Sequence, residues 1–518
     1  EKEENKKMSN FSNDTQRKTG IALSYIHTAL SAIISIIYIP ILLHSIGQSE
    51  YGLYQLLGSV IAYFSTMYSS LNSSVMKYYT QYLITGDNDK MENTLALSRR
   101  IFLIVSIFLV FISIPVGFLY TIAYQKNLTE HELHESIAMF AVMVINILVY
   151  LNNSIYSASI MSHECFVFRR SLDVIAQILQ PIAVVLFIQK YPHALTIVIV
   201  QLLLNCAIAI LNIIYSKRKL HVTVVYHGND PELIRGLLSL SGSVLIVSFA
   251  DQIFWKTDQL ILGQMYGTSV VAVYSIGAQL SSIYISSGIV IASVLLPMLT
   301  KIINQDTDGS KLSRVFAQLG RYQSFIIMLA MSGIALYGRE FILILAGEDY
   351  LDGYVVAMLL MIPYTVDLIQ NSGNTIMQAE NKYWYRARIL FSAAIVNIVM
   401  TYFGAKKYGM YGAAGATTIT IVITSWFIMN YVYSKKINLD IKFFWKEVLP
   451  VWGWGIFPLL VGRLIGKIQI ENLFVQFTVH VILYLIVYSI FLWSIIMKPN
   501  EKKYLIGNIA KGHNKSCL

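Results

Sequence analysis

Long apolar stretches recur along the whole chain, and they limit its fold more than any other feature. Runs of roughly 17 to 25 mainly apolar residues recur from Gly20 to Met497, and each can cross the ~30 Å hydrocarbon core of a bilayer as a helix. In lipid, only helices and closed barrels satisfy all their backbone hydrogen bonds. The sequence therefore predicts an all-α polytopic membrane protein.

The apolar stretches number about fourteen, and short polar segments separate them. They span 20–44, 52–82, 101–124, 136–162, 171–189, 194–216, 237–265, 269–299, 322–346, 354–378, 387–404, 411–434, 448–466 and 473–497. Charged residues make up only 13% of the 518 residues, about half their share in soluble proteins, which excludes a water-soluble globule. No charged-then-apolar segment with a cleavage site precedes the first stretch, so we expect no removable signal peptide.

Lysine and arginine are distributed unevenly between the two sets of loops. With the amino terminus inside, the inside segments hold 30 of the 39 basic residues and the outside segments hold 7. The positive-inside rule therefore places both termini in the cytoplasm. Because the basic residues explain topology and contact with anionic lipid, the net charge of +10 does not indicate a nucleic-acid partner.

Signals for cofactors and nucleotides are missing from the sequence. Cys165, Cys206 and Cys517 are far apart, so they predict neither a disulfide framework nor a zinc site. No GxxxxGK[ST] loop occurs, so ATP is not expected to drive the protein directly. We predict no cofactor, and an H⁺ or Na⁺ gradient or the membrane potential as the energy source.

Two weak repeats point to an internal duplication. GQSEYGLY (47–54) matches GTSVVAVY (267–274) at an offset of 220 residues, which is the separation of Gly47 and Gly267. MSHECFVFRR (161–170) matches MQAENKYWYR (377–386) at an offset of 216. Both offsets equal six predicted helices, so the sequence predicts two six-helix lobes in parallel orientation, followed by two C-terminal helices.

The duplication predicts how the chain is organised. The predicted parts are a cytoplasmic tail (1–19), an N-lobe (20–216), a cytoplasmic inter-lobe linker (217–236), a C-lobe (237–434), a cytoplasmic loop (435–447), helices 13 and 14 (448–497) and a cytoplasmic tail (498–518). Two parallel lobes suit alternating access, in which they rock about a cavity that opens to one side and then the other. An enzyme would not need this symmetry.

Polar residues follow one face of three apolar stretches. The candidate cavity-lining residues are Ser70 and Ser73 on the second stretch, Gln279 and Ser282 on the eighth, and Asp367, Gln370, Asn371, Asn374 and Gln378 on the tenth. Serine also joins packed membrane helices by hydrogen bonds, and this interpretation is favoured for the serines. The tenth stretch carries larger polar groups and a carboxylate, which favours a cavity wall suited to sugars.

Three charged residues lie inside the seventh stretch, 237–265. Asp251 and Asp258 share a helical face, whereas Lys256 points elsewhere and needs a partner on another helix, for which Asp367 is one candidate. One interpretation is a structural ion pair. The other has Lys256 or Lys77 binding an anionic headgroup, while Asp251, Asp258 or Asp367 exchanges H⁺ or Na⁺.

Four motifs together resemble a known family. They are IGQSEYGLYQLLGS (46–59), TDQLILGQMYGTSVVAVYSIGAQL (257–280), IQNSGNTIMQAENKYWYRARI (369–389) and GMYGAAGATTI (409–419). Their order and spacing resemble the polysaccharide transporters, the O-unit and capsule repeat-unit flippases of the multidrug/oligosaccharidyl-lipid/polysaccharide exporter superfamily. The resemblance covers the first twelve predicted helices.

The resemblance implies a multi-pass protein of the bacterial inner membrane. It implies transfer of an undecaprenyl-diphosphate-linked oligosaccharide to the outer leaflet for surface polysaccharide such as capsule or O-antigen. Partners would be membrane lipid and a polysaccharide polymerase with its chain-length protein. Asp258 corresponds to an acidic residue common in the family's seventh helix, and the family supplies no catalytic residue to transfer.

Three alternatives remain. Lipid II flippases look similar but carry cavity arginines, whereas the first stretch has none after Arg17 and the eighth has none. Multidrug or cation antiporters usually carry a carboxylate in the first helix, where this chain has only His27 and His44. A membrane glycosyltransferase or polymerase would need a large outside loop for bond chemistry, and the longest one, about 339–353, is short.

Overall fold

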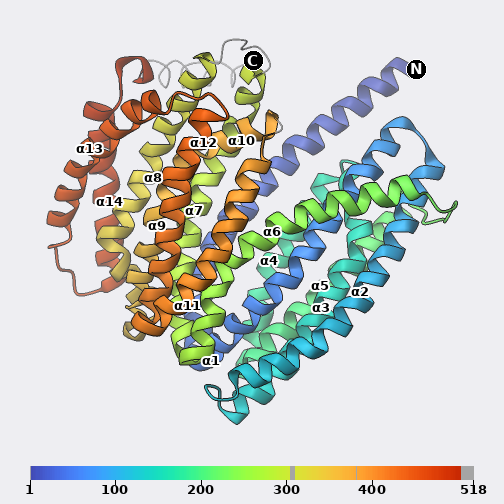
Figure 1. Ribbon diagram of the computed structural model, residues 1–518, viewed down its shortest axis with the longest axis horizontal. Coiled ribbons are helices and arrows are strands. Elements are labelled where there is room, and N and C mark those ends of the chain that lie inside the picture. The colour runs from blue at the N-terminus through green and yellow to red at the C-terminus, as the bar shows by residue number, and fades with distance from the viewer. Residues whose placement is uncertain (1, 304–309, 381, 503–518) are drawn as a thin grey trace. The chain divides into compact units, whose positions relative to one another are not determined.

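Helices form almost all of the protein. The computed structural model describes residues 2–303, 310–380 and 382–502 (Figure 1). No β-strand occurs among these residues, so the predicted all-α fold is confirmed. The chain divides into two compact units, Glu1–Ser275 and Ile276–Leu518.

The first unit is a bundle built around its longest helix. Its helices are α1 (Lys2–Thr85), α2 (Asn88–Tyr124), α3 (Glu130–Ser162), α4 (Phe166–Ile188), α5 (Ala194–Arg218), α6 (Pro231–Tyr266) and the start of α7 (Thr268–Ile303). α1 packs against α3, α4 and α6. α3 packs between α2 and α5, and these three helices lie side by side in Figure 1.

The second unit contains the rest of α7 and ten further helical elements. They are α8 (Ser310–Leu345), the short 3₁₀ helix η1 (Glu348–Tyr350), α9 (Gly353–Ile369), α10 (Asn371–Ala379), α11 (Trp384–Ile421), the π-helix η2 (Val422–Ile428), α12 (Met429–Lys435), α13 (Ile441–Ile465), α14 (Leu473–Phe491) and the π-helix η3 (Leu492–Ile496). α8 packs against α9, α13 and α14.

Twelve helical segments among the described residues are long and apolar enough to span a membrane. Two of them, Ile33–Thr85 and Trp384–Lys435, run for 53 and 52 residues, which at 1.5 Å per residue is about 80 Å and more than twice the hydrocarbon thickness. The first breaks at Gly47 and the second at Tyr408 and Gly409, where the backbone is not helical. Each therefore accommodates two crossings, in agreement with the fourteen predicted stretches.

α2 displays the side chains expected of a lipid-facing helix. Ile104, Phe111 and Phe118 are 67%, 69% and 67% exposed, and their spacing of seven residues places them on one face. A continuous apolar surface of this kind is unfavourable in water but not in hydrocarbon. This face of α2 is therefore suited to contact with acyl chains.

The first repeated motif places a glycine in the same unusual conformation twice. Gly47 has φ 79° and ψ 176° at the break in α1, and Gly267 between α6 and α7 has φ 81° and ψ −172°. This region of backbone space is essentially restricted to glycine. The two copies of the motif thus share a backbone conformation as well as sequence similarity, which supports the predicted duplication.

The second repeated motif lies at the junction of two helices both times. Residues 161–170 contain the turn from α3 to α4, and residues 377–386 contain the turn from α10 to α11. The predicted lobes, 20–216 and 237–434, remain a prediction. The division into compact units falls at Ser275, within α7.

The predicted tenth stretch, 354–378, is two helices rather than one. α9 ends at Ile369 and α10 starts at Asn371, with Gln370 between them at φ −99° and ψ 8°. The polar residues at this point therefore surround a break and do not continue one uninterrupted helical face.

Two side chains, one on α11 and one on η2, donate hydrogen bonds to α9 at its proline. Pro363 has no N–H, so the carbonyl of Leu359 four residues earlier lacks its helical donor. The hydroxyl of Thr418 donates to this carbonyl at 2.6 Å, and the indole of Trp426 donates to the carbonyl of Pro363 at 3.0 Å. Both bonds fix α9 against its neighbours.

Candidate functional site

A polar cavity lies among α1, α3, α4 and α5 of the first unit. Its volume is about 250 Å³. The polar residues that line it are His27, Tyr150, Asn153, Arg169, Asp173, Gln177, Gln180 and Asn205. Such a concentration is costly inside helices that are apolar enough to span a membrane, and it marks a candidate functional site.

α4 supplies half of this polar lining from one face. Arg169, Asp173, Gln177 and Gln180 are spaced by four, four and three residues, so at ~100° per residue they lie within about 80° of one another on the helix. The opposite side carries exposed apolar residues such as Ile178 and Ile182. The strong amphipathic pattern of α4 therefore turns its polar side to the cavity.

One guanidinium group, that of Arg169, and one carboxylate, that of Asp173, line the cavity. Asp173 lies 3.1 Å from the Nη2 atom of Arg169 and 3.4 Å from the Nη1 atom of Arg170. The Nη1 atom of Arg169 is buried and has no hydrogen-bond acceptor among the described residues. Arg169 therefore keeps a donor that is available to an anionic ligand, although its charge is balanced by Asp173.

Two asparagine pairs hold α3 and α5 together beside the cavity. Asn205 donates to Asn146 at 2.8 Å, and Asn212 donates to Asn153 at 3.3 Å. Both members advance by seven residues from one pair to the next, so the two helices run in the same direction. The pairs lock the cavity wall, because buried amides need partners in an apolar bundle.

The predicted residues on the second stretch show mixed environments. Ser70 is buried and donates to the carbonyl of Met67, which matches a packing role. Ser73 and Lys77 are exposed, one helical turn apart, and the Lys77 ammonium lies 5.5 Å from the ring of Tyr78. An exposed polar face thus exists on this helix of the first unit.

The three charged residues of α6 also differ from one another. Asp251 is exposed and Lys256 is partly buried. Asp258 is buried and accepts a hydrogen bond of 2.5 Å from the hydroxyl of Tyr274. No carboxylate lies within salt-bridge distance of Lys256 in the part of the chain that the structure describes.

Asp367 has a close partner that the sequence did not suggest. Its two carboxylate oxygens accept from the guanidinium group of Arg386 at 3.1 and 3.3 Å. The side chains are 20% and 12% exposed. The predicted role of Asp367 in ion exchange remains a prediction, and any such role would have to break this bidentate pair.

The other predicted residues of the second unit lie on α7 and around the break at Gln370. On α7, Gln279 is partly buried and Ser282 is exposed. Gln370 donates to Asn430 at 2.8 Å, and Asn374 donates to Asn371 at 2.9 Å while accepting from Tyr433. The side chain of Gln378 lies outside the described residues. These contacts join the ends of α9 and α10 to α12, so the polar side chains around the break hold these helices together.

A comparison with known families identifies the chain. Residues 18–303, more than half of its length, match the family described as "Polysaccharide biosynthesis protein". The chain belongs to this family. The match includes the first repeated motif in both copies and the whole of the polar cavity.

One curated relative is a bacterial membrane protein. It is named "Uncharacterized membrane protein in cps region" from Klebsiella pneumoniae, and it is 24% identical over 216 residues. The alignment covers 41% of this chain and 42% of the relative, so this family member matches less than half of that protein's length.

Solved transporter structures share the fold of this polysaccharide biosynthesis protein. A lipid II flippase, MurJ, in an inward closed conformation superposes with a TM-score of 0.70 at 16% identity, covering 92% of this chain and 100% of MurJ. An inward-facing multidrug resistance MATE family transporter of the MOP superfamily has a TM-score of 0.60 at 11% identity, covering 84% and 98%. The family member thus shares its fold with these two transporters.

The cavity residues of α4 were missed by the sequence reasoning, although the signal was present. Arg169 was assigned to a cytoplasmic loop at 163–170, whereas Asp173 fell inside the next apolar stretch. The helix actually starts at Phe166. Testing the helical period across the predicted boundary would have joined both residues to Gln177 and Gln180.

Proposed function

We propose that this protein is a flippase that moves undecaprenyl-diphosphate-linked oligosaccharide repeat units from the cytoplasmic to the outer leaflet by alternating access. Its family and its transporter fold support the general activity. The polar cavity supports this choice of cargo, because a guanidinium nitrogen without an acceptor among the described residues, beside amides and a tyrosine, suits an anionic headgroup that is followed by sugar hydroxyls. The reaction makes and breaks no bond.

In this proposal, basic side chains receive the diphosphate. Lys77 and Lys256 are the candidates from the sequence, and Arg169 joins them because no described residue accepts from its Nη1 atom. The polar faces that include Ser73, Gln279 and Ser282 contact the sugars, while the polyprenyl tail stays in lipid. Diphosphates favour such contacts, since hydrogen bonds between ionised groups are about twice as strong as neutral ones.

The energy source in this proposal is an H⁺ or Na⁺ gradient. Asp251 is exposed, Asp258 is held by Tyr274, and Asp367 is paired with Arg386. All three carboxylates are candidates for exchanging the coupling ion. We further propose a bacterial inner membrane with both termini in the cytoplasm, and a polysaccharide polymerase with its chain-length protein as partners. A relative named for a cps region supports a role in surface polysaccharide.

Depletion of the protein in its host tests the activity. Lipid-linked repeat units should accumulate in the cytoplasmic leaflet, protected from a membrane-impermeant periodate label that is added outside. Re-expression of the intact chain should restore labelling. Normal outside labelling in depleted cells would refute the flippase proposal.

A reconstituted assay tests the cargo. Radiolabelled repeat units that accumulate in the depleted cells are placed in proteoliposomes, with lipid II and a cationic dye as rival cargoes. The repeat units should become accessible from the opposite leaflet faster than either rival. Longer glycan chains would instead indicate a polymerase, and preferential movement of lipid II or dye would support the alternative transporters.

Removing two candidate headgroup charges should impair transport. We expect the Lys77→Ala/Lys256→Ala double variant to move repeat units at least about tenfold more slowly, because each lost charge-assisted hydrogen bond is worth about 1.5–3 kcal/mol. The proteoliposome assay measures this rate. Lys126→Ala removes the same charge from the exposed turn between α2 and α3 and should leave the rate unchanged. An unaltered rate in the double variant would exclude both lysines as headgroup ligands.

A further inference from the structure

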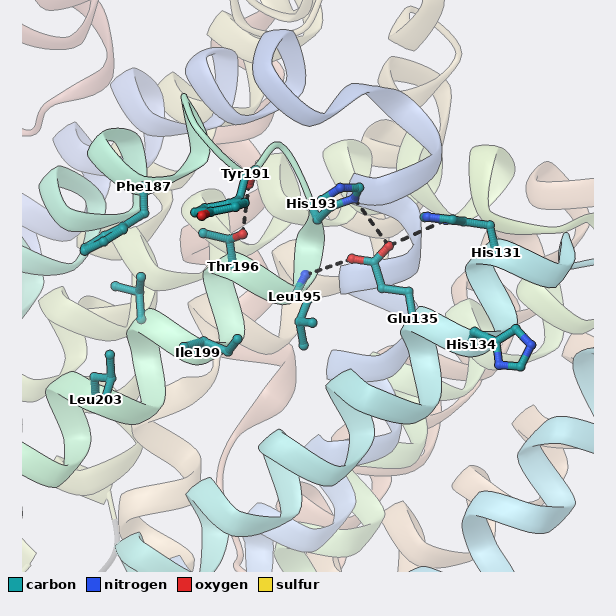
Figure 2. Close-up of a pocket in the computed structure, with 11 residues that line it drawn as sticks. His131, His134, Glu135, Phe187, Tyr191, His193, Leu195, Thr196, Ile199 and Leu203 are labelled. Carbon is teal, nitrogen blue, oxygen red and sulfur yellow. Dashed lines mark hydrogen bonds and ion pairs between the residues drawn. The ribbon is translucent and has the colours of Figure 1, made fainter.

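Two histidines and a glutamate meet at the start of α3 and α5, away from the polar cavity. The Oε2 atom of Glu135 lies 3.8 Å from the Nδ1 atom of His131 and 3.7 Å from that of His193. Figure 2 shows the carboxylate pointing between the two rings, while His134 of the same helical turn points away. The three ligand-type atoms all lie within 4.8 Å of one another.

The local structure fixes the backbone at two of these three residues. Thr129 and Glu132 form a capping box at the start of α3, which fixes the first turn that carries His131. Glu135 follows four residues later on the same face. His193 is the N-cap residue of α5 but makes no side-chain capping bond, so its ring remains available to a ligand.

Glu135 uses only one of its two oxygens in the fold. The Oε1 atom accepts from the backbone N–H of Leu195 at 3.1 Å, which caps α5. The side chain is only 7% exposed, and its Oε2 atom is buried without a hydrogen-bond donor among the described residues. A buried carboxylate oxygen without a donor is costly, and here it faces the two imidazoles.

A second carboxylate increases the negative charge at this point. Glu50 of α1 accepts from the backbone N–H of Ala194 at 2.8 Å. Its carboxyl group is close enough to Glu135 for the two to interact. Two neighbouring carboxylates repel each other when both are ionised, so a bound cation would stabilise the pair.

The spacing of the three atoms fits a metal ion better than direct hydrogen bonds. Separations of 3.7 and 3.8 Å exceed hydrogen-bond length. In a tetrahedral zinc site, bonds of about 2.0–2.1 Å place neighbouring ligand atoms about 3.3–3.4 Å apart. The three ligand-type atoms lie within 4.8 Å of one another, and rotation of the two exposed rings would shorten these separations to the zinc values.

We propose that His131, Glu135 and His193 bind one Zn²⁺ ion. Two imidazoles and one carboxylate form a ligand set that zinc uses in proteins, with the fourth position left for water or another ligand. That position opens to a hollow of about 510 Å³, which Phe187, Tyr191 and Leu203 line. The ion joins the start of α3 to the start of α5. The site is separate from the proposed cargo path, so it stands whether or not the protein is a flippase.

Zinc titration of the purified full chain tests the proposal. The protein carries an affinity tag without histidine, is stripped of metal with a chelator, and is titrated against a chromophoric zinc indicator. We expect one Zn²⁺ per chain, and an increase in apparent Tm when zinc is added. Co²⁺ in place of Zn²⁺ should give the intense visible absorption of a tetrahedral site. Absence of saturable binding would overturn the proposal.

Matched variants assign the ligands. His131→Ala/His193→Ala should lower the zinc affinity at least about tenfold and abolish the Tm increase, and both side chains are exposed enough to be removed without unfolding. Glu135→Gln keeps an acceptor for Leu195 but removes the charge, and it should also weaken binding. His134→Ala is the control and should bind zinc as the parent does. Equal affinity in the parent and the double variant would overturn the assignment.

Discussion

Replacing Arg386 by leucine is expected to lower the free energy of unfolding by about 3–5 kcal/mol, because it leaves the carboxylate of Asp367 buried without its counter-charge. The guanidinium group makes two parallel hydrogen bonds to that carboxylate, and both side chains are at least four-fifths buried. Titration with SDS in mixed micelles, followed by tryptophan fluorescence, measures the change.

Two comparisons separate the ion pair from other effects of the substitution. The double variant Asp367→Leu/Arg386→Leu should recover most of the loss, since removing both charges avoids the uncompensated one. Arg388→Leu lies two residues further along α11, where the guanidinium group is exposed and stacks on Trp384 at 4.3 Å. It should cost less than about 1 kcal/mol. Additive losses in the double variant would contradict the assigned pairing.

Replacing Gly52 by alanine should destabilise the first unit by about 1–3 kcal/mol. A Cβ atom at Gly52 would overlap the carbonyl oxygen of Thr268 and lie 2.6 Å from its carbonyl carbon. Backbone cannot move aside as a flexible side chain can. The same crossing is fixed by Thr268, which donates to Glu132 at 2.8 Å and contacts Ser49 at 3.1 Å. Thermal unfolding in detergent measures the effect as a lower Tm.

Gly58 supplies the control on the same helix. It lies six residues after Gly52, and a Cβ atom there would meet nothing within 4 Å. Alanine is favoured over glycine in a helix by up to about 1 kcal/mol, so Gly58→Ala should be neutral or stabilising. An equal loss at both positions would show that close contact with Thr268 is not the cause.

The membrane spans could be predicted from the sequence because a bilayer imposes a minimum apolar length on every crossing. The break between α9 and α10 at Gln370 could not be predicted from the sequence. Nothing in the local sequence excludes a continuous helix through Gln370 and Asn371. The break is accompanied by contacts of Gln370 with Asn430 and of Asn374 with Tyr433, which join residues 60 and 59 positions apart.

The sequence reasoning did not find the polar cavity of the first unit, because none of the predicted site residues lines it. Helical spacing placed Ser73 on a polar face of the second stretch, and this side chain is exposed. It could not identify the partner of Asp367, because Arg386 was counted with a cytoplasmic segment, and the two meet only after the chain turns back between α10 and α11. Pairings across a turn depend on its geometry, which single-sequence periodicity does not contain.

The two matching glycine turns require a backbone handedness that ordinary L-residues do not favour. Gly47 and Gly267 adopt dihedral angles that are the mirror image of an ordinary extended L-residue. Empty space surrounds the position of a Cβ atom at Gly47, so handedness rather than crowding restricts this site. A D-alanine would fit where L-alanine strains the backbone. Both copies of the repeated motif therefore keep an achiral residue at this position, although most of the residues between glycine and tyrosine differ.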